Sequence, residues 1–361
     1  MKWEWQKFRS KKLNFSPILL FLILLLIPLI FQFSSSQENR DAQEIIDAQS
    51  TKTDLESEID RLTKQEGNPT RIATLTKKVE MYRALLRALE NGDDKKALQA
   101  QSEIAQEDYQ EMIASGQTGE QVKEQKLLSA KLKYFSNHQI ALIEPLHTQK
   151  LPLINYFVFF IQLIPYSTLW LMALLFLCKY FTDEQTDTAS VWIWLAPQKP
   201  VTLFFKKMIL YFAFLCVSFV FPLLVVSVIV SIFSGIGMKE YPLFFLGETG
   251  EIVMKTAFNY LIEYVIGTIL LYLLLTVLCA TLSLVFEKFT ITFAVSLCLI
   301  TLGQLFLKDQ HNILNLPEII STCSRNEFLK RILMLVLLIS CSICVFFVLI
   351  RVKEKGKSFI P

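Results

Sequence analysis

The sequence predicts an all-α polytopic membrane protein, with six transmembrane helices and a helical extracellular insert between the first and second spans. Hydrophobic residues make up 53% of the 361 residues, and the mean hydropathy is +0.42, which is too apolar for an ordinary soluble chain. The apolar residues are also unevenly placed, because residues 34–150 are polar and long apolar runs follow Leu151. Basic residues gather in alternate short loops, as they do in proteins that cross a membrane several times.

Six apolar runs are long enough to span a bilayer. A helix rises about 1.5 Å per residue, so roughly 20 apolar residues cross a hydrocarbon layer about 30 Å thick. The runs that meet this length are approximately 15–33, 153–178, 208–233, 257–282, 289–307 and 329–350.

The basic residues predict the orientation of these spans. Fourteen Lys and Arg residues fall in the segments on one side, which are 1–14, 179–207, Lys288 and the tail 351–361. The opposite loops, 234–255 and 308–331, hold two and four. Because Lys and Arg in short loops resist translocation, we expect both termini to be cytoplasmic, with residues 34–150 outside the cell membrane.

The N-terminal region has alternative interpretations. Residues 1–14 interleave Trp3, Trp5 and Phe8 with basic residues, which is typical of a cytoplasmic amphipathic segment in the headgroup layer and also of an aromatic belt. The apolar run 15–33 is a first transmembrane helix or, since serines follow it, a cleaved signal peptide. Its length of about 19 residues favours a retained anchor over the 7–15-residue core of a signal peptide.

The insert, residues 34–150, predicts a mainly helical domain. Its clearest apolar stripe has spacings of three and four residues and comprises Ile72, Leu75, Val79, Tyr82, Leu86 and Leu89. A shorter stripe of Leu55, Ile59 and Leu62 precedes it, and the break Gly67–Asn68–Pro69 predicts a helical hairpin. Further helices are expected from about Leu98 to Met112 and from Glu120 to Phe135. Such stripes indicate a packed core or, alternatively, a surface that grips cargo or a partner.

The residue types of catalytic sites are scarce in this chain. The three histidines have no cysteine or carboxylate at metal-ligand spacing, and the net charge of +3 carries no basic stripe for nucleic acid. Gly356–Lys357–Ser358 ends like a phosphate-binding loop, but Arg351 stands where the leading glycine is needed. We therefore expect no enzyme activity, metal, cofactor or nucleic acid for this chain itself.

Glu263 is a carboxylate well inside an apolar run. A charge at membrane depth costs several kcal/mol unless it is paired, neutralised or near water. Glu263 is therefore expected either to be a functional group that faces a cavity or to lie near the outer headgroups. Lys255 or a tyrosine hydroxyl would satisfy it in either case.

The loop 179–207, within the five-helix remainder 151–350, resembles the signature of type-2 ABC exporter permeases. In that family a Glu is followed by Gly-Thr, a short amphipathic coupling helix, a turn with Pro and a Lys at the next span. Here Glu184, Thr188, Pro197 and Lys206 or Lys207 take those places, with Asp187 where the family usually has Gly. The layout of six spans, external insert and basic tail is also similar.

The resemblance implies a transport subunit that lacks its own nucleotide-binding motif. It implies a partner, a cytosolic ABC ATPase that binds ATP and Mg, and a second permease subunit in a homodimer or heterodimer. The residues implied to couple the two proteins are Glu184, Thr188, Val191, Trp192, Trp194, Leu195 and Pro197. The tryptophans have a second interpretation, as anchors of the loop in the headgroup layer.

Two other functions compete with export of an unidentified peptide, lipid or drug-like substrate. One is a non-transporting membrane sensor or immunity component that recognises an extracellular peptide through residues 34–150. The other is an intramembrane enzyme, which the absence of paired catalytic residues within the spans disfavours.

Overall fold

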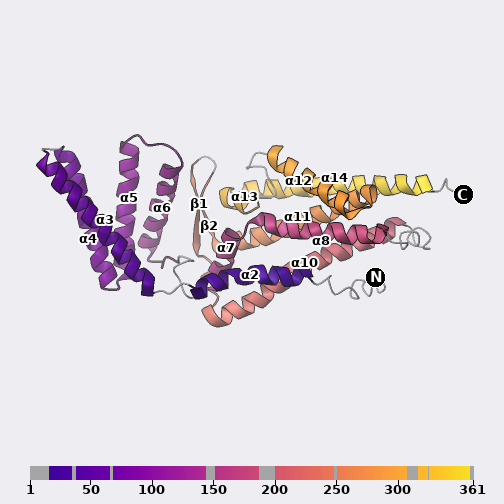
Figure 1. Ribbon diagram of the computed structural model, residues 1–361, viewed down its shortest axis with the longest axis horizontal. Helices are drawn as coiled ribbons and strands as arrows, with labels where there is room; N and C mark the ends of the chain where they lie inside the picture. The colour runs from indigo at the N-terminus through magenta and orange to yellow at the C-terminus, as the bar shows by residue number, and fades with distance from the viewer. Residues whose placement is uncertain are drawn as a thin grey trace. The chain divides into compact units, whose positions relative to one another are not determined.

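The computed structural model describes residues 16–34, 38–65, 68–143, 151–186, 200–247, 250–306, 316–323 and 325–357. The chain divides into two compact units, whose elements are labelled in Figure 1. The apolar unit comprises Met1–Pro28, Pro152–Leu243 and Lys255–Pro361, and the polar unit comprises Leu29–Leu151 and Phe244–Met254. Each unit is described by itself below.

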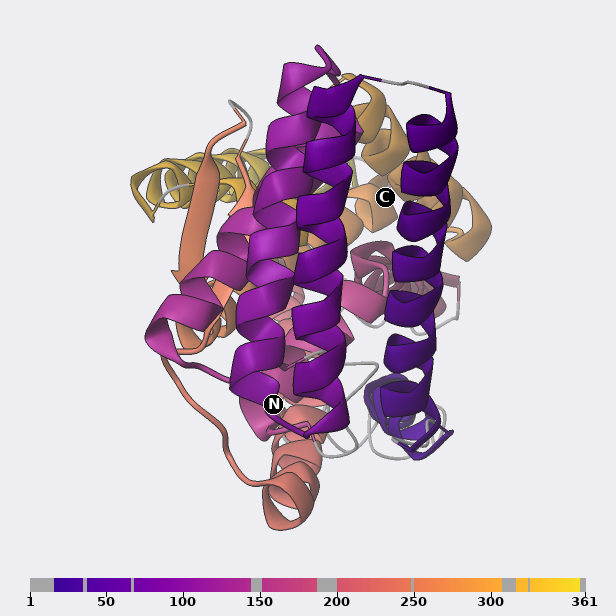
Figure 2. The same ribbon diagram turned by 90° about the vertical axis from the view of Figure 1, so that its left-hand side faces the viewer.

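The polar unit contains four helices that follow one another along the chain. They are α3 (Glu38–Lys64), α4 (Pro69–Glu90), α5 (Asp94–Ala114) and α6 (Glu120–His138). Each packs against the next, so α4 and α5 are the inner helices of the row (Figure 2). The predicted hairpin of two helices is therefore confirmed as α3 and α4, and the predicted helix from Glu120 is confirmed as α6.

The helix ends of this unit follow from local sequence. The Asn68 side chain accepts a hydrogen bond from the backbone N–H of Thr70 at 2.9 Å, and Pro69 occupies the first turn of α4, where its missing N–H costs nothing. Asp93 caps α5 in the same way through the N–H of Lys96 at 3.2 Å. The predicted break before Pro69 therefore separates α3 from α4, and a second break at Asn91–Asp93 separates α4 from α5.

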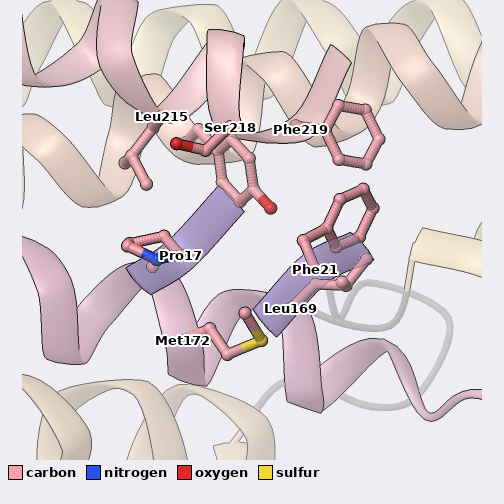
Figure 3. Close-up of a pocket in the computed structure, with 9 residues that line it drawn as sticks. Pro17, Phe21, Leu169, Met172, Leu215, Ser218 and Phe219 are labelled. Atoms are coloured by element: carbon pink, nitrogen blue, oxygen red, sulfur yellow. The ribbon is translucent and has the colours of Figure 1, made fainter. Parts of the chain in front are cut away.

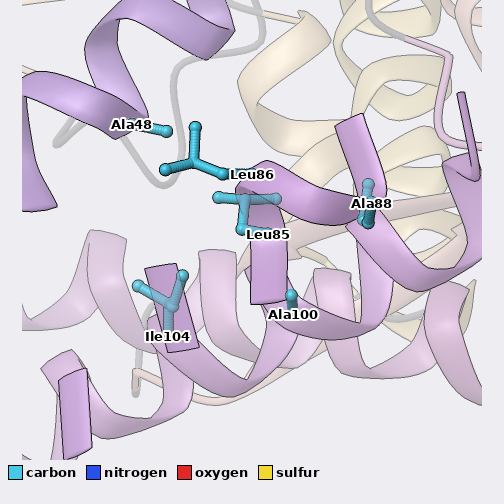
Figure 4. Packing of buried hydrophobic residues seen from close by; sticks show 7 residues of the cluster. Ala48, Leu85, Leu86, Ala88, Ala100 and Ile104 are labelled. Carbon is cyan, nitrogen blue, oxygen red and sulfur yellow. The ribbon is translucent and has the colours of Figure 1, made fainter. Parts of the chain in front are cut away.

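The core of the polar unit forms around α4. Leu75, Val79 and Leu86 of the predicted stripe are buried, whereas the shorter stripe of α3 is only half-buried. Figure 4 shows that the buried cluster is rich in alanine, which lets neighbouring helices approach closely. Its members are Ala48, Leu85, Leu86, Ala88, Ala97, Ala100 and Ile104. Leu85 and Ala88 lie outside the predicted stripe, because α4 packs against α3 and α5 on two sides.

Ion pairs tie α4 to α5 along the surface. Lys77 Nζ lies 2.7 Å from Glu107 Oε2, and Lys78 Nζ lies 2.6 Å from Asp108 Oδ1 and also contacts Glu111. Lys77 is 55% exposed, so its pair with Glu107 contributes little to stability. Lys78 is only 13% exposed, so water screens its ion pairs less.

A two-stranded β-hairpin corrects the all-α prediction. Its strands are β1 (Pro242–Leu246) and β2 (Ile252–Thr256). The residues 244–254 at its tip belong to the polar unit, where the Phe244 ring lies 5.4 Å from that of Tyr134 and 6.0 Å from that of Phe135. Lys126 Nζ of α6 also donates to the carbonyl oxygen of Gly250 at 2.7 Å. The hairpin tip is therefore an integral part of the polar unit.

The apolar unit is built from long helices. They are α7 (Leu153–Leu163), α8 (Tyr166–Thr186), α10 (Pro200–Ser234), α11 (Ala257–Phe286), α12 (Phe289–Phe306), α13 (Leu316–Thr322), α14 (Arg325–Lys357) and the part of α2 (Ser16–Ser34) up to Pro28. Helix α11 is central, since α7, α8, α10, α12, α13 and α14 all pack against it.

Within the described residues, three helices are long and apolar enough to cross a membrane. These spans are Val201–Ser234, Ala257–Phe286 and Glu327–Val352, and the bent pair α7–α8 makes a fourth if it counts as one span. The apolar stretches Ser16–Ile30 and Phe289–Leu302 are shorter. The chain is accordingly a mostly helical membrane protein, while six spans remain a prediction.

The predicted span 153–178 is not one straight helix. Helix α7 ends at Leu163, and α8 starts at Tyr166 in a direction 77° away. Pro165 has no N–H to donate and disfavours a helical conformation at Ile164, which is extended. Hydropathy alone predicts one continuous span here because it does not register the effect of this proline on the backbone.

Candidate functional site

The predicted coupling residues lie at the edge of the described chain. Glu184 belongs to the last turn of α8, but its side chain is outside the described part. The remaining coupling residues are also outside the described residues: Thr188, Val191, Trp192, Trp194, Leu195 and Pro197. After them, α10 begins at Pro200, and Lys207 in its second turn is only 5% exposed. The candidate coupling segment thus joins the end of α8 to the start of α10.

Glu263 is paired with Lys255. Its Oε2 accepts a hydrogen bond from Lys255 Nζ at 2.7 Å, and the side chains are 14% and 9% exposed. Lys255 stands on β2, two residues before α11 begins, and Glu263 lies in the second turn of that helix. Lys255 Nζ is also 6.0 Å from the ring centre of Phe328 on α14. The carboxylate is therefore neutralised within the protein by one of the partners named from the sequence.

A second polar group lies where α8 begins. The Tyr166 hydroxyl donates to Thr268 Oγ1 of α11 at 3.3 Å, and its ring lies 5.6 Å from that of Tyr264 in an edge-on contact. Thr268 in turn donates to the carbonyl oxygen of Tyr264 at 2.8 Å. Buried hydroxyls in an apolar interior require such partners. This group therefore fixes the broken end of α8 against α11.

Helix α2 packs specifically within the apolar unit. Phe21 and Leu25 are 3% and 0% exposed, and the Phe21 ring lies 5.2 Å from that of Phe219 on α10. The Tyr156 hydroxyl of α7 donates to the carbonyl oxygen of Leu25. Pro28 has no N–H to donate to the carbonyl oxygen of Leu24, and the Tyr156 hydroxyl adds a donor at the neighbouring carbonyl of Leu25.

A small cavity lies between α2, α8, α10 and α11. Figure 3 shows the side chains that converge on it, and its lining comprises Pro17, Phe21, Leu169, Met172, Ala173, Leu215, Ser218, Phe219 and Tyr272. Its volume is about 20 Å³, which is enough for a single water molecule. This cavity therefore cannot hold cargo in the conformation described.

A larger cavity, called the apolar cavity below, lies between α7, α10 and α11. Its volume is about 110 Å³. Its lining comprises Phe157, Phe160, Ile161, Phe219, Leu223, Leu261, Tyr264 and Val265. Tyr264 is the only one of these residues whose side chain carries a polar group, so the lining suits an apolar ligand.

Two cysteines meet inside the apolar unit. Cys178 Sγ of α8 lies 3.6 Å from Cys279 Sγ of α11 and 3.9 Å from Ser296 Oγ of α12. Two thiols make an incomplete zinc site. Across the described part of the chain, no group of three His, Cys, Asp or Glu residues is placed to hold a metal ion.

Comparison of the chain with protein-family models, with curated proteins and with solved structures found no match.

Proposed function

We propose that this chain is the membrane-spanning permease subunit of an ATP-driven exporter. The observation that carries the proposal is the cytoplasmic stretch from Glu184 to Lys207, which is similar to the coupling region of type-2 ABC exporter permeases. A separate cytosolic ABC ATPase would bind ATP and Mg and supply the energy. The cargo, a peptide, lipid or drug-like molecule, would move outward across the cell membrane.

The helices on either side of the coupling segment support this proposal. Residues 187–199 connect α8 to α10, and both helices pack against α11. A displacement of the segment by an ATPase would therefore reach α11 through two helices at once. Nucleotide can shift the conformation of the permease only if the ATPase contacts its two states differently. We propose that this segment makes those contacts.

The packing of α2 supports a retained first span, which the proposed layout of six spans with both termini in the cytoplasm requires. A signal peptide that is cleaved and lost needs no lasting partners, whereas Phe21 and Leu25 are buried and Leu25 accepts a hydrogen bond from α7. In an exporter of this kind, two permease subunits, identical or different, form the membrane part. Cysteine labelling in intact cells tests the layout, since Ser115→Cys in the polar unit should react without lysis.

The polar unit also supports a second function. Residues Leu29–Leu151 with Phe244–Met254 have their own buried core and inter-helix ion pairs, as a recognition domain requires. The chain would then be a non-transporting membrane sensor or immunity component that recognises an extracellular peptide. Recovery of an ABC ATPase with the chain in a mild detergent would favour the exporter over the sensor.

The deciding experiment changes two tryptophans of the coupling segment. We expect Trp192→Ala and Trp194→Ala together to weaken ATPase binding by about 2 kcal/mol, roughly 30-fold, because aromatic side chains often dominate an interface. Stimulation of ATP hydrolysis should fall in parallel. Membrane insertion should remain normal.

The matched control is Trp3→Ala with Trp5→Ala, which removes two tryptophans from another segment on the proposed cytoplasmic side. If tryptophans serve only as headgroup anchors, both double variants should behave alike and keep the ATPase. Full ATPase binding and stimulation by the Trp192/Trp194 variant would remove the main support for the exporter.

A further inference from the structure

The apolar cavity is lined in part by helices that are long and apolar enough to cross a membrane. Leu223 belongs to the span Val201–Ser234, and Leu261 and Val265 belong to the span Ala257–Phe286. Its floor is fully packed, since Phe160, Ile161 and Phe219 are buried. Its rim is not, because Phe157, Leu223, Leu261 and Val265 are partly exposed. The cavity is therefore open on the side where these four residues lie.

Two interruptions in the helices explain why packing is incomplete here. Helix α7 ends at Leu163, two residues after Ile161, because Pro165 follows. Helix α10 contains Pro222 between Phe219 and Leu223, and this proline removes a backbone hydrogen bond at that turn. Two of the three walls are thus irregular near the cavity.

The surface beside the rim is hydrocarbon-like. Phe221 and Leu224 of α10 are 53% and 60% exposed, and Ile262 and Ile266 of α11 are 41% and 43% exposed. In a membrane span such residues face lipid chains. These exposed residues are close in sequence to the cavity-lining residues of α10 and α11, and the group available at such lipid-facing surfaces is an apolar, flexible lipid chain.

We infer that the apolar cavity binds one acyl chain of a membrane phospholipid. A cavity of about 150 Å³ lined by Leu, Ile and Phe binds benzene, so about 110 Å³ accommodates a segment of roughly four chain carbons. The chain enters between Leu223 and Leu261, and its end lies against Phe160 and Phe219. This inference rests on the membrane location of these helices and not on the exporter proposal, so either one can fail alone.

Photolabelling of the full chain in phosphatidylcholine vesicles tests the inference. One acyl chain of the lipid carries a diazirine near its end, and the labelled residues are mapped by mass spectrometry. Lipid that only surrounds the protein reaches exposed residues, whereas an inserted chain also labels the buried floor. We expect label on Phe160 or Phe219. A floor that stays unlabelled while Ile262 and Leu224 are labelled would overturn the inference.

Matched variants of α11 make the result specific. Val265→Phe adds a ring to the rim of the cavity and should lower floor labelling about threefold or more, because little free volume remains. Ile266→Phe makes a similar change at the next residue, which does not line the cavity, and should leave floor labelling unchanged. Leu261→Phe replaces Val265→Phe if that variant does not give monodisperse protein. Equal labelling of the floor in the cavity-filling variant and in Ile266→Phe would overturn the inference. A change of oligomeric state in the cavity-filling variant alone would also overturn it, because the occupant would then be a second copy of the chain.

Discussion

Removal of one member of the Lys255–Glu263 pair should destabilise the apolar unit more than removal of an exposed charge would. At 2.7 Å and an effective dielectric constant of about 20, the attraction between the two charges is roughly 6 kcal/mol. Desolvation offsets much of this, since the side chains are only 9% and 14% exposed. When one partner is removed, however, the other stays shielded from water without its counter-charge, which costs about 3 kcal/mol or more.

The assay is thermal unfolding of the full chain in detergent. We expect Glu263→Gln to lower the apparent Tm by about 6–12 °C, given about 2–4 °C per kcal/mol for a unit of this size. Lys255→Met should have a similar effect. The double variant should recover much of the loss, because it leaves no buried charge.

The matched control is Glu240→Gln, the same chemical change at an exposed position of the apolar unit. It should leave the Tm within about 1 °C, as surface substitutions usually do. The reasoning would be refuted if Glu263→Gln behaved like this control. It would also be refuted if the double variant were less stable than both single variants.

Three further outcomes are expected from local geometry. Gly237→Ala should lower the Tm more than Gly250→Ala. Both glycines have a positive φ, of +81° and +77°, so both substitutions strain the backbone. Only at position 237 would the new Cβ also lie 2.6 Å from Pro152 Cβ, a clash that costs about 1–3 kcal/mol more. Tyr156→Phe should loosen α2 by about 1 kcal/mol, because Leu25 loses its hydroxyl donor next to Pro28, and faster amide exchange in α2 would report this. The hydrogen bond from Lys78 holds the pKa of Glu111 below its usual value of 4.5, so the ionised carboxylate stabilises the polar unit above that pH and loses this effect as the pH falls below it. In Glu111→Gln, the protection of α4 and α5 amides from exchange should therefore fall less on acidification than in the unmodified chain. An equal fall in protection would contradict this assignment.

The sequence predicted the polar unit well because its signals are local. The stripe from Ile72 to Leu89, the proline after Asn68 and the turn before Asp94 each act within a few residues, and α4 and α5 follow from them. The hairpin was missed although its signals are also local. Pro242–Leu246 and Ile252–Thr256 are rich in aromatic and β-branched residues with glycines between them, but they lie in a short loop between spans, where the apolar runs alone predict no strand.

The apolar unit was predictable in outline only. Hydropathy located the ends of the long helices to within about eight residues, but their apolar residues face both lipid and protein, so periodicity does not show which sides pack together. The bond from Tyr156 to Leu25 joins residues 131 positions apart, and nothing near either residue predicts it. The Lys255–Glu263 pair could be named in advance because the two residues are eight apart and a charge at that depth needs a partner.

The polar unit is discontinuous in sequence, and this limits how it can be exchanged. Residues 29–151 supply its helices, but Phe244 and Gly250 arrive from a second insertion more than ninety residues further along the chain. A chimera that transplants only the first segment would leave Phe135, which is fully buried here, without the ring of Phe244 beside it. Recombination between related proteins would therefore have to transfer both segments together. A functional graft would need four junctions with the host chain, whereas a domain inserted as one segment needs two.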